Sequence, residues 1–317
     1  MALVLTEADV TALLPMSVAL EAAEEVFRWQ GEGRLTNRSR VRLPVPGGLL
    51  HVMAAALPEG RVMGLKAYAT VRGGAKFVVL LFSAETGALL AVIEADRLGQ
   101  MRTGAASGVA TKHLARADAD RVGCYGTGWQ AGSQLEAVCA VRPVREVRVY
   151  GRDPERRKRF AESLAQTLAV PVVPADRPEA AAEGASILVT ITSSKTPVLE
   201  GAWIEAGAHV NAAGSNALAR AEIDVEAVRR ASLIVTDSLE QAQVECGDLV
   251  AAIEQGVIGW DAVHELGEIV AGKHPGRQRA SDITLFESQG VAMEDVAVAV
   301  RVVARARAQG IGLEIPI

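Results

Sequence analysis

The chain has few aromatic residues, little excess charge and no long hydrophobic run. Of its 317 residues only 4% are aromatic, and 33 Lys and Arg are set against 38 Asp and Glu, for a net charge of −5. A mildly acidic chain of this kind lacks the basic surface of a nucleic-acid-binding protein. No apolar stretch approaches the roughly 20 residues that cross a bilayer. We therefore expect neither a nucleic acid nor a membrane among its partners.

Cysteine and histidine are also scarce. The cysteines Cys124, Cys139 and Cys246 are odd in number and form no CxxC pair, and the five histidines are scattered. This pattern argues against a disulfide scaffold and against a metal site, and it suits a reducing compartment. The first ten residues include Glu7 and Asp9 and have no basic lead-in, so we expect no signal peptide. The sequence thus predicts a cytoplasmic protein without a metal ion.

The length and the apolar content predict two domains with substantial cores. Half of the residues are hydrophobic and 22% are charged, in a chain about twice as long as a typical domain. Thr6 and Asp9 have the spacing of a helix cap, and a second helix should begin near Pro15 and end before Gly31. Alternating residues then predict strands up to about residue 96, with a hairpin turn at Gly47-Gly48. The first hundred residues therefore read as a helical start followed by a mostly antiparallel sheet.

From Arg121 onward, strand-like and helix-like segments alternate. Residues 121–126 and 146–151 read as strands, each followed by a helical stretch, which is typical of βαβ units and a parallel sheet. Before them, residues 98–114 predict a helix crowded with small side chains, with Arg102 and Thr103 at its exposed N-terminal end. Such a helix either packs closely against another backbone or lies beneath a cofactor, and the two are compatible. A last helix should end at Gly310.

A glycine-rich turn directly after the strand at residue 121 carries the strongest chemical signal. Residues 126–131 have the GxGxxA pattern of a dinucleotide-binding turn, in which the first glycine allows the tight turn and the second lets the backbone approach a pyrophosphate. The alternative is a glycine-rich turn without a ligand. Because a strand, a helix and a second strand follow in the required order, we favour nucleotide binding. Its residues are Gly126, Thr127, Gly128, Trp129, Gln130 and Ala131.

The end of the next strand bears on which nucleotide binds. Gly151 occupies the position where NAD enzymes usually have a carboxylate for the ribose, and the next residue is Arg152. A guanidinium can pair bidentately with a 2′-phosphate, and Arg156 and Arg157 lie nearby, so the sequence favours NADP. Asp153 could still bind a ribose hydroxyl, which leaves NAD open. Alternatively, the arginines form a solvated helix face.

Four further segments are distinctive: GLKAY around Lys66, LGQMRTGAASGVATKHLAR around Arg102, GAHVNAAGSNALARAEID around Gly214, and TLFESQGVAMEDVAVA near the C-terminus. Together they resemble the ornithine cyclodeaminase/mu-crystallin family, which also contains alanine dehydrogenases and cyclic imine reductases. The resemblance implies a doubly wound Rossmann parallel sheet, residues 119–287, inserted into an α+β substrate-binding and dimerisation domain of residues 1–118 and 288–317. It also implies a homodimer paired through that domain.

The same resemblance assigns roles to individual residues. Lys66 matches an active-site lysine that binds the substrate and can donate a proton, and Arg102 matches the arginine that clamps the substrate α-carboxylate. Arg38 most plausibly matches a second carboxylate-binding arginine, with Arg40 and Arg42 as close rivals. Read without the resemblance, Lys66 is an ordinary strand lysine and Arg102 a helix-terminal salt-bridge residue. A carboxylate held by guanidinium groups fixes the α-carbon for hydride exchange with a nicotinamide.

One departure from the family pattern bears on the reaction. Cyclodeaminases and alanine dehydrogenases of the family have an aspartate after the NAxG motif, whereas this chain has Asn216. Because asparagine cannot act as a base near neutral pH, we favour the reduction of a preformed cyclic ketimine, with Lys66 as the acid. The resemblance thus implies an NAD(P)-dependent oxidoreductase for a small α-imino or α-amino acid. The alternatives are an ornithine cyclodeaminase, in which another group replaces the aspartate, and a nucleotide-dependent binding protein with little turnover.

Overall fold

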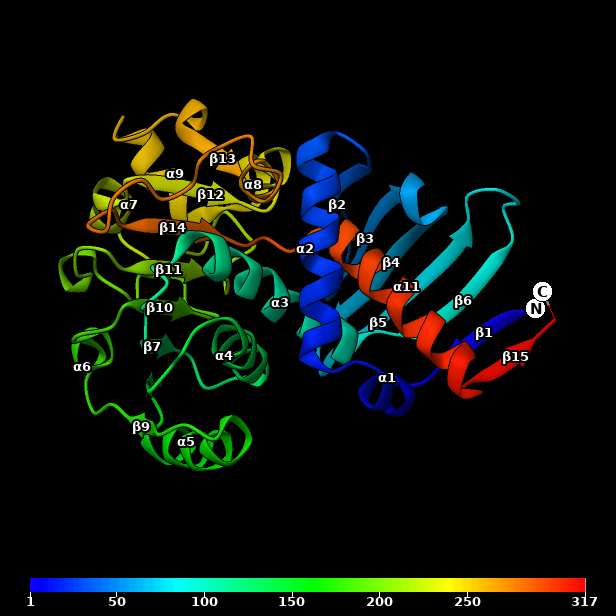
Figure 1. Cartoon of the computed structure of the whole chain (residues 1–317), viewed down its shortest axis with the longest axis horizontal. Helices are drawn as coiled ribbons and strands as arrows, with labels where there is room; N and C mark the ends of the chain where they lie inside the picture. The colour runs from blue at the N-terminus through cyan, green and yellow to red at the C-terminus, as the bar shows by residue number, and fades with distance from the viewer. Residues whose placement is uncertain (317) are drawn as a thin grey trace. The chain divides into compact units, whose positions relative to one another are not determined.

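The computed structural model describes residues 1–316 and contains two compact units (Figure 1). The first unit comprises residues 1–102 and the chain from Gly290 onward, and the second comprises residues 103–289. The first boundary falls inside a helix, between Arg102 and Thr103, whereas the sequence placed it after that helix. Gly99, early in this helix, lies against Lys66 of the first unit, and Gly104, further along, lies against Ser133 of the second.

The first unit is a seven-stranded mixed sheet with helices. Its strands follow the order β15-β1-β6-β5-β4-β3-β2, and the successive pairs from β2 to β6 are antiparallel. Strand β1 pairs parallel with β6 and antiparallel with β15. The elements are β1 (Ala2–Leu5), α1 (Glu7–Leu13), α2 (Met16–Glu32), β2 (Thr36–Val45), β3 (Gly48–Leu57), η1 (Pro58–Gly60), β4 (Val62–Val71), β5 (Gly74–Ser83), β6 (Leu89–Glu94), α11 (Ala292–Gln309) and β15 (Leu313–Ile315).

The beginning of the chain differs from the expected helical start. Residues 2–5 form β1, which lies inside the sheet between β6 and β15, so its short apolar run is buried from both sides. The predicted cap is confirmed, because Thr6 and Asp9 form a capping box at the start of α1. Helix α2 continues past Gly31 and ends at Gly33, whose φ of 73° closes it in the left-handed conformation.

Helices α2 and α11 pack together, and α11 covers one face of the first sheet (Figure 1). Gly64 on β4 permits this contact, because a Cβ there would lie 3.0 Å from Val296 on α11 and 2.8 Å from the Leu80 carbonyl oxygen. The first turn of α11 is therefore held directly against the central strands.

The second unit is an eight-stranded sheet in which every paired strand is parallel. Its order is β13-β12-β14-β11-β10-β7-β8-β9, so the winding direction reverses between β7 and β10. The elements are α3 (Asp96–Leu114, shared with the first unit), β7 (Arg121–Tyr125), α4 (Trp129–Val141), β8 (Glu146–Tyr150), α5 (Pro154–Leu168), β9 (Val172–Pro174), α6 (Pro178–Ala182), β10 (Ile187–Thr190), η2 (Gly201–Trp203), β11 (His209–Ala212), α7 (Val225–Arg230), β12 (Leu233–Thr236), α8 (Leu239–Glu245), α9 (Gly247–Glu254), η3 (Trp260–Ala262), β13 (Val263–Glu265), α10 (Leu266–Val270) and β14 (Thr284–Glu287).

Two apolar cores lie on opposite faces of this parallel sheet. One core includes Leu135 on α4 and Leu164 on α5, and the other includes Val228 on α7 and Leu249 on α9. Helices therefore cover both faces, which confirms the predicted doubly wound Rossmann architecture. Across residues 1–316, none of the helices combines the length and the apolar character needed to span a membrane.

Candidate active site

Four buried charged side chains from three elements meet in the first unit. Lys66 on β4 donates from Nζ to Oδ1 of Asp295 in the first turn of α11, at 2.9 Å. Arg102 on α3 donates from Nε to the same oxygen at 3.1 Å and from Nη1 to Oε2 of Glu294 at 2.7 Å. All four side chains are less than a tenth exposed. The structure thus unites the two residues named from the sequence, Lys66 and Arg102, through two carboxylates that were not named.

Two glycines make room for these cations. A Cβ on Gly99 of α3 would lie 2.6 Å from Lys66 Nζ. Gly290 has a φ of 74°, and a Cβ there would collide with the guanidinium of Arg102. Any larger residue at either position would displace a charged end group, so the observed positions of the Lys66 and Arg102 side chains require glycine at both sites.

A bulge in β2 decides which arginine joins this group. The pairing of β2 with β3 shifts register between Arg38 and Val41, which turns Arg40 toward the face of the sheet that carries Lys66. Arg40 is buried, and its Nη2 donates to the Gly290 carbonyl oxygen at 2.9 Å. Its neighbour Arg42 is half-buried.

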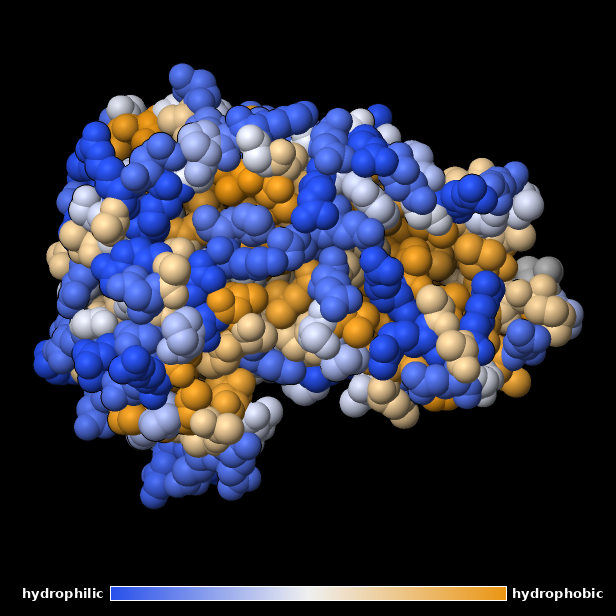
Figure 2. Space-filling view, viewed as in Figure 1, coloured by the Kyte–Doolittle hydropathy of each residue, from blue (hydrophilic) through white to orange (hydrophobic). Residues whose placement is uncertain are grey.

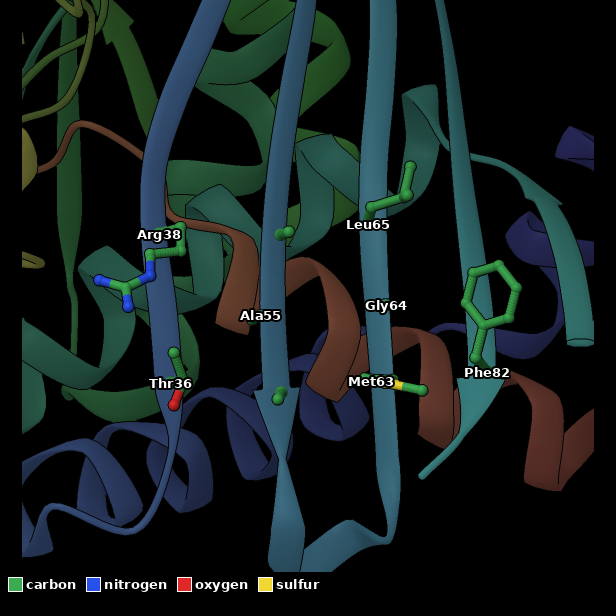
Figure 3. Close-up of a pocket in the computed structure, with 9 residues that line it drawn as sticks. Thr36, Arg38, Ala55, Met63, Gly64, Leu65 and Phe82 are labelled. Carbon is green, nitrogen blue, oxygen red and sulfur yellow. The ribbon is translucent and has the colours of Figure 1, made fainter. Parts of the chain in front are cut away.

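Arg38 does not belong to this group. Its side chain is exposed and lines a pocket of about 320 Å³ together with Thr36, Met63 and Phe82 (Figure 3). The β3 side chains that point to the same face of the sheet as Arg40 are buried. Ala54, which pairs with Arg38, points to the other face and is exposed. The structure therefore places Arg40, one of the two rivals of Arg38, with Lys66 and Arg102, and the arginine that binds the substrate carboxylate stays a prediction.

The buried charges do not cancel. Lys66, Arg102 and Arg40 contribute three positive charges, and Glu294 and Asp295 contribute two negative ones. Burial lowers the pKa of Lys66, while the Asp295 carboxylate opposes that shift. The two carboxylates lie in the first turn of α11, where the helix dipole favours negative charge. An excess of one positive charge in a buried setting suits a ligand with a single carboxylate.

An aromatic stack borders Lys66 on the same sheet. The ring of His51 stacks on Tyr68 with centroids 4.2 Å apart, and Tyr68 stacks on Phe77 at 5.0 Å. Lys66 Nζ lies 5.3 Å from the centroid of the Phe77 ring. Burial, assisted by the nearby arginines, lowers the pKa of His51 to about 4, so its imidazole is neutral at pH 7. The lysine therefore has an uncharged aromatic surface beside it.

In the second unit, the glycine turn has the form that a pyrophosphate needs. Gly126 follows β7 with a φ of 125°, and a Cβ there would collide with the Ile191 carbonyl group. Gly128 is the N-cap of α4 and supplies no side-chain cap, and Trp129 is 58% exposed in the first turn. The buried Oε1 of Gln130 has no hydrogen-bond partner among residues 1–316. These features fit a phosphate group at the helix N-terminus.

The residues after β8 support this turn. A Cβ on Gly151 would lie 2.9 Å from Oγ1 of Thr127, so the strand end and the glycine turn pack directly against each other. Arg157 is buried and donates to the Gly151 carbonyl oxygen at 2.8 Å, which makes it part of the scaffold. Arg152, in contrast, is exposed at the end of the strand.

Asp153 and Arg156 have structural contacts as well. Asp153 is the N-cap of α5 and accepts a hydrogen bond from the Arg156 backbone at 3.0 Å. Arg156 also donates from Nε to the Thr127 carbonyl oxygen at 3.2 Å. Hydrophilic residues cover the outer side of α5 (Figure 2), and Arg156 and Arg159 are among its exposed side chains. Arg156 and Arg157 thus hold the scaffold through these hydrogen bonds, whereas Arg152 is exposed.

The close helix contact expected around residues 98–114 is present. A Cβ on Gly104 of α3 would collide with the Ser133 backbone of α4, and the Thr103 carbonyl oxygen accepts a hydrogen bond from Gln134 at 3.2 Å. The small residues in the second half of α3 therefore serve packing against the helix that carries the glycine turn.

Asn216 lies half-buried in the loop after β11, in the second unit. A buried carboxylate holds the start of this loop, since Oε2 of Glu222 accepts hydrogen bonds from the Gly214 backbone at 2.7 Å and from Thr190 at 3.0 Å. Burial raises the pKa of Glu222 to about 7. Among residues 1–316, no group of three His, Cys, Asp or Glu side chains is arranged to hold a metal ion.

Glu294 and Asp295 are the functional candidates that sequence reasoning missed. Both belong to the C-terminal segment quoted for the resemblance, where two consecutive acidic residues stand inside the apolar run VAMEDVAVAV. Acidic residues in a helix that is otherwise buried need cationic partners, so this pattern in the sequence could have pointed to Glu294 and Asp295.

A model of the ornithine cyclodeaminase/mu-crystallin family matches residues 1–310 of this chain. The alanine dehydrogenase of Archaeoglobus fulgidus is 36% identical over 322 aligned residues, which cover 99% of this chain and 98% of that protein.

Two solved structures share the whole fold. The Δ1-pyrroline-2-carboxylate reductase of Thermococcus litoralis, in complex with NADH and L-proline, superposes with a TM-score of 0.94 at 35% identity and covers 99% of this chain and 100% of its own. An archaeal alanine dehydrogenase dimer with bound NAD superposes with a TM-score of 0.93 at 36% identity, covering 100% of this chain and 99% of its own. The glycine turn, the charged group around Lys66 and these matches lead to one conclusion: the chain belongs to the ornithine cyclodeaminase/mu-crystallin family.

Proposed function

We propose that this protein is an NAD(P)-dependent oxidoreductase that reduces the C=N bond of a small α-imino acid, with a cyclic ketimine carboxylate as the favoured substrate. The observation that carries the proposal is the buried Lys66 ammonium, which shares Asp295 with Arg102 and lies on the same sheet face as Arg40. Relatives that act on alanine and on pyrroline-2-carboxylate support the substrate class.

The two buried arginines would bind the substrate carboxylate. Planar guanidinium groups suit a carboxylate, and the contacts of Arg102 with Glu294 and Asp295 hold its side chain in one orientation. The Gly290 carbonyl group holds Arg40 in the same way. With its carboxylate neutralising the excess positive charge, the substrate would present its C=N bond in a fixed position.

Lys66 would complete the reduction by donating one proton. When bound, a reduced nicotinamide supplies the hydride that adds to the α-carbon. The C=N π bond then becomes a C–N single bond, and the nitrogen takes a proton from the Lys66 ammonium, which becomes a neutral amine. A lysine whose pKa is lowered by burial is a better acid than one in water.

Ornithine cyclodeaminase activity is the second candidate. Asn216 replaces the aspartate that the family uses for that reaction, so another carboxylate would have to move protons at the substrate amine. Asp295, beside Lys66, is the carboxylate that favours this candidate. Its oxygen already accepts hydrogen bonds from both Lys66 and Arg102, which makes it a poor base, so we rank reduction first.

We also propose a preferred nucleotide and an oligomeric state. The exposed Arg152 would pair with a 2′-phosphate and favour NADP over NAD, although the solved relatives described above contain NAD or NADH. The active protein would be a homodimer formed through the first unit. The exposed apolar side chains of β2 support that surface: Val41, Leu43 and Val45, each at least half exposed.

Steady-state assays test the proposed reaction. NADPH and NADH are each combined with pyrroline-2-carboxylate, its six-membered ring homologue, and pyruvate with ammonia, and oxidation of the nucleotide is followed. We expect turnover with the cyclic imines and a loss of about 10²-fold or more in kcat for Lys66→Met. Ammonia release from ornithine without net nucleotide consumption, and no turnover of any imine, would establish the cyclodeaminase instead. Nucleotide binding without either reaction would indicate a binding protein.

A further inference from the structure

We propose that Asp295 is a positioning residue that keeps the Lys66 side chain charged and fixes its Nζ against α3, so that the lysine can donate a proton. This inference rests on the proposed function, in which Lys66 is the acid. It assigns a task to a residue near the C-terminus of the chain, and it separates that task from the one performed by its neighbour Glu294.

The geometry places one carboxylate oxygen between two cations. Asp295 Oδ1 accepts from Lys66 Nζ at 2.9 Å and from Arg102 Nε at 3.1 Å. The other oxygen, Oδ2, is buried and has no hydrogen-bond partner within residues 1–316. Because Asp295 is fully buried and Lys66 is 3% exposed, solvent screens their attraction little. The position of the ammonium therefore depends on a single oxygen atom.

The other groups around Lys66 would leave it neutral. Arg40 from β2 and Arg102 from α3 are cations, and on its own strand the Tyr68 ring lies 6.0 Å from Nζ. The Phe77 ring of β5 carries no charge. Burial lowers the pKa of Lys66 most, the two arginines lower it further, and Asp295 from α11 is the acidic group that raises it. A lysine deprived of Asp295 would lose the proton that the reaction requires.

Glu294 provides a matched control on the same helix turn. It is as buried as Asp295 and carries the same charge, but its ion pair is with Arg102 Nη1, at 2.7 Å. Lys66 Nζ donates to Asp295, whereas Arg102 Nη1 donates to Glu294. Removal of Glu294 should therefore disturb carboxylate binding by Arg102, whereas removal of Asp295 should disturb the protonation of Lys66.

The pH dependence of imine reduction separates these two tasks. In the native enzyme, kcat should fall at high pH as Lys66 loses its proton. For Asp295→Asn we expect this fall to move to lower pH by about one unit or more, so that a loss of about tenfold near neutral pH is regained on acidification. For Glu294→Gln we expect a higher KM for the imino acid, while kcat falls at the same pH as in the native enzyme. A loss for Asp295→Asn that is equal at every pH, or a shift equal to that of Glu294→Gln, would overturn the proposal.

Two further measurements keep the test decisive. Asp295→Glu retains the carboxylate, so it should keep the native position of the pH profile with a lower kcat; if Asp295→Asn does not fold, a shifted profile for Asp295→Glu would contradict the proposal. Unfolding free energies of Asp295→Asn, Lys66→Met and the double variant require no substrate. We expect the double variant to lose less stability than the sum of the single ones, and additive losses would show that the pair does not interact.

These outcomes distinguish a failure of this inference from a failure of the proposed function. Coupling in the stability cycle without turnover of any imine would leave the Lys66–Asp295 pair intact and refute the reaction. Turnover of imines with an unmoved pH profile in Asp295→Asn would confirm the reaction and refute the role of Asp295.

Discussion

Lys66 and Asp295 are 229 positions apart in the sequence, and yet Lys66 Nζ donates a hydrogen bond to Asp295 Oδ1 at 2.9 Å. The pair connects a strand in the middle of the first sheet with the last helix of the chain. The first unit is therefore complete only when α11 returns to the sheet.

Gly99→Ala should lower activity by displacing Lys66. The new Cβ would lie 2.6 Å from Lys66 Nζ, so the end of the lysine side chain must move. That movement weakens the buried contact with Asp295, and the gain of up to about 1 kcal/mol for alanine over glycine in a helix offsets this cost only in part. We expect a clear loss in kcat together with a lower melting temperature. In the Lys66→Met background, where no ammonium is displaced, the same substitution should leave the melting temperature unchanged or raise it, and a loss there would show that the helix itself is disturbed.

Arg40→Met and Arg38→Met should differ in their effect on substrate binding. Arg40 is buried beside Lys66, whereas Arg38 is exposed at a different pocket. Loss of a charged hydrogen-bonding group from a carboxylate site costs about 2 to 3 kcal/mol. We therefore expect Arg40→Met to raise KM for the imino acid by about 30-fold or more, and Arg38→Met to change it little. The reverse order in steady-state kinetics would restore Arg38 as the carboxylate ligand.

The contribution of Arg152 can be measured by thermal shift with NADPH, NADH, NADP and NAD. A ligand that binds the folded state raises the melting temperature according to its affinity. If Arg152 binds a 2′-phosphate, the phosphorylated nucleotides should give the larger shift, and Arg152→Ala should abolish that preference. Arg159→Ala, an exposed arginine on α5, serves as the control. Equal shifts with NADH and NADPH in the native protein would contradict the NADP assignment.

Glu222 should make the second unit less stable as the pH rises. Its folded pKa of about 7 lies above the ordinary value of 4.5, so its stabilising contribution is complete below pH 4.5 and is lost up to about pH 7. Glu222→Gln does not titrate. Across that window the unfolding free energy of the variant should gain about 3 kcal/mol relative to the native protein, measured by denaturant titration. A constant difference would show that Glu222 has an ordinary pKa.

His209 should make the second unit less stable as the pH falls. Burial lowers its pKa to about 3, and its ring nitrogens lie 2.9 Å from Thr284 Oγ1 and 3.2 Å from Asn211 Oδ1. Its contribution is therefore complete above pH 6.5 and is lost as the pH falls toward 3. Between pH 6.5 and about 4.5, His209→Gln should gain about 3 kcal/mol relative to the native protein. An unchanged difference on acidification would mean that the buried imidazole accepts a proton.

The local sequence pattern was sufficient to predict the elements whose conformation depends on residues close to one another in the chain. The Thr6–Asp9 capping box, the strand and helix alternation after Arg121, and the turn at Gly126 all follow from spacing within a few positions. Short-range pattern failed for β1 and β15. Each of these strands is at most four residues long, and their pairing joins the two ends of the chain.

By itself, the sequence determined the parallel sheet and the glycine turn and singled out Lys66 and Arg102 as candidates, because backbone periodicity and the family motifs are encoded locally. Only the tertiary structure decided that Arg40 and not Arg38 lies with them, and that Glu294 and Asp295 complete the group. The physical reason is that a bulge reverses which side chains face inward, and that buried charges must find their partners wherever packing brings them.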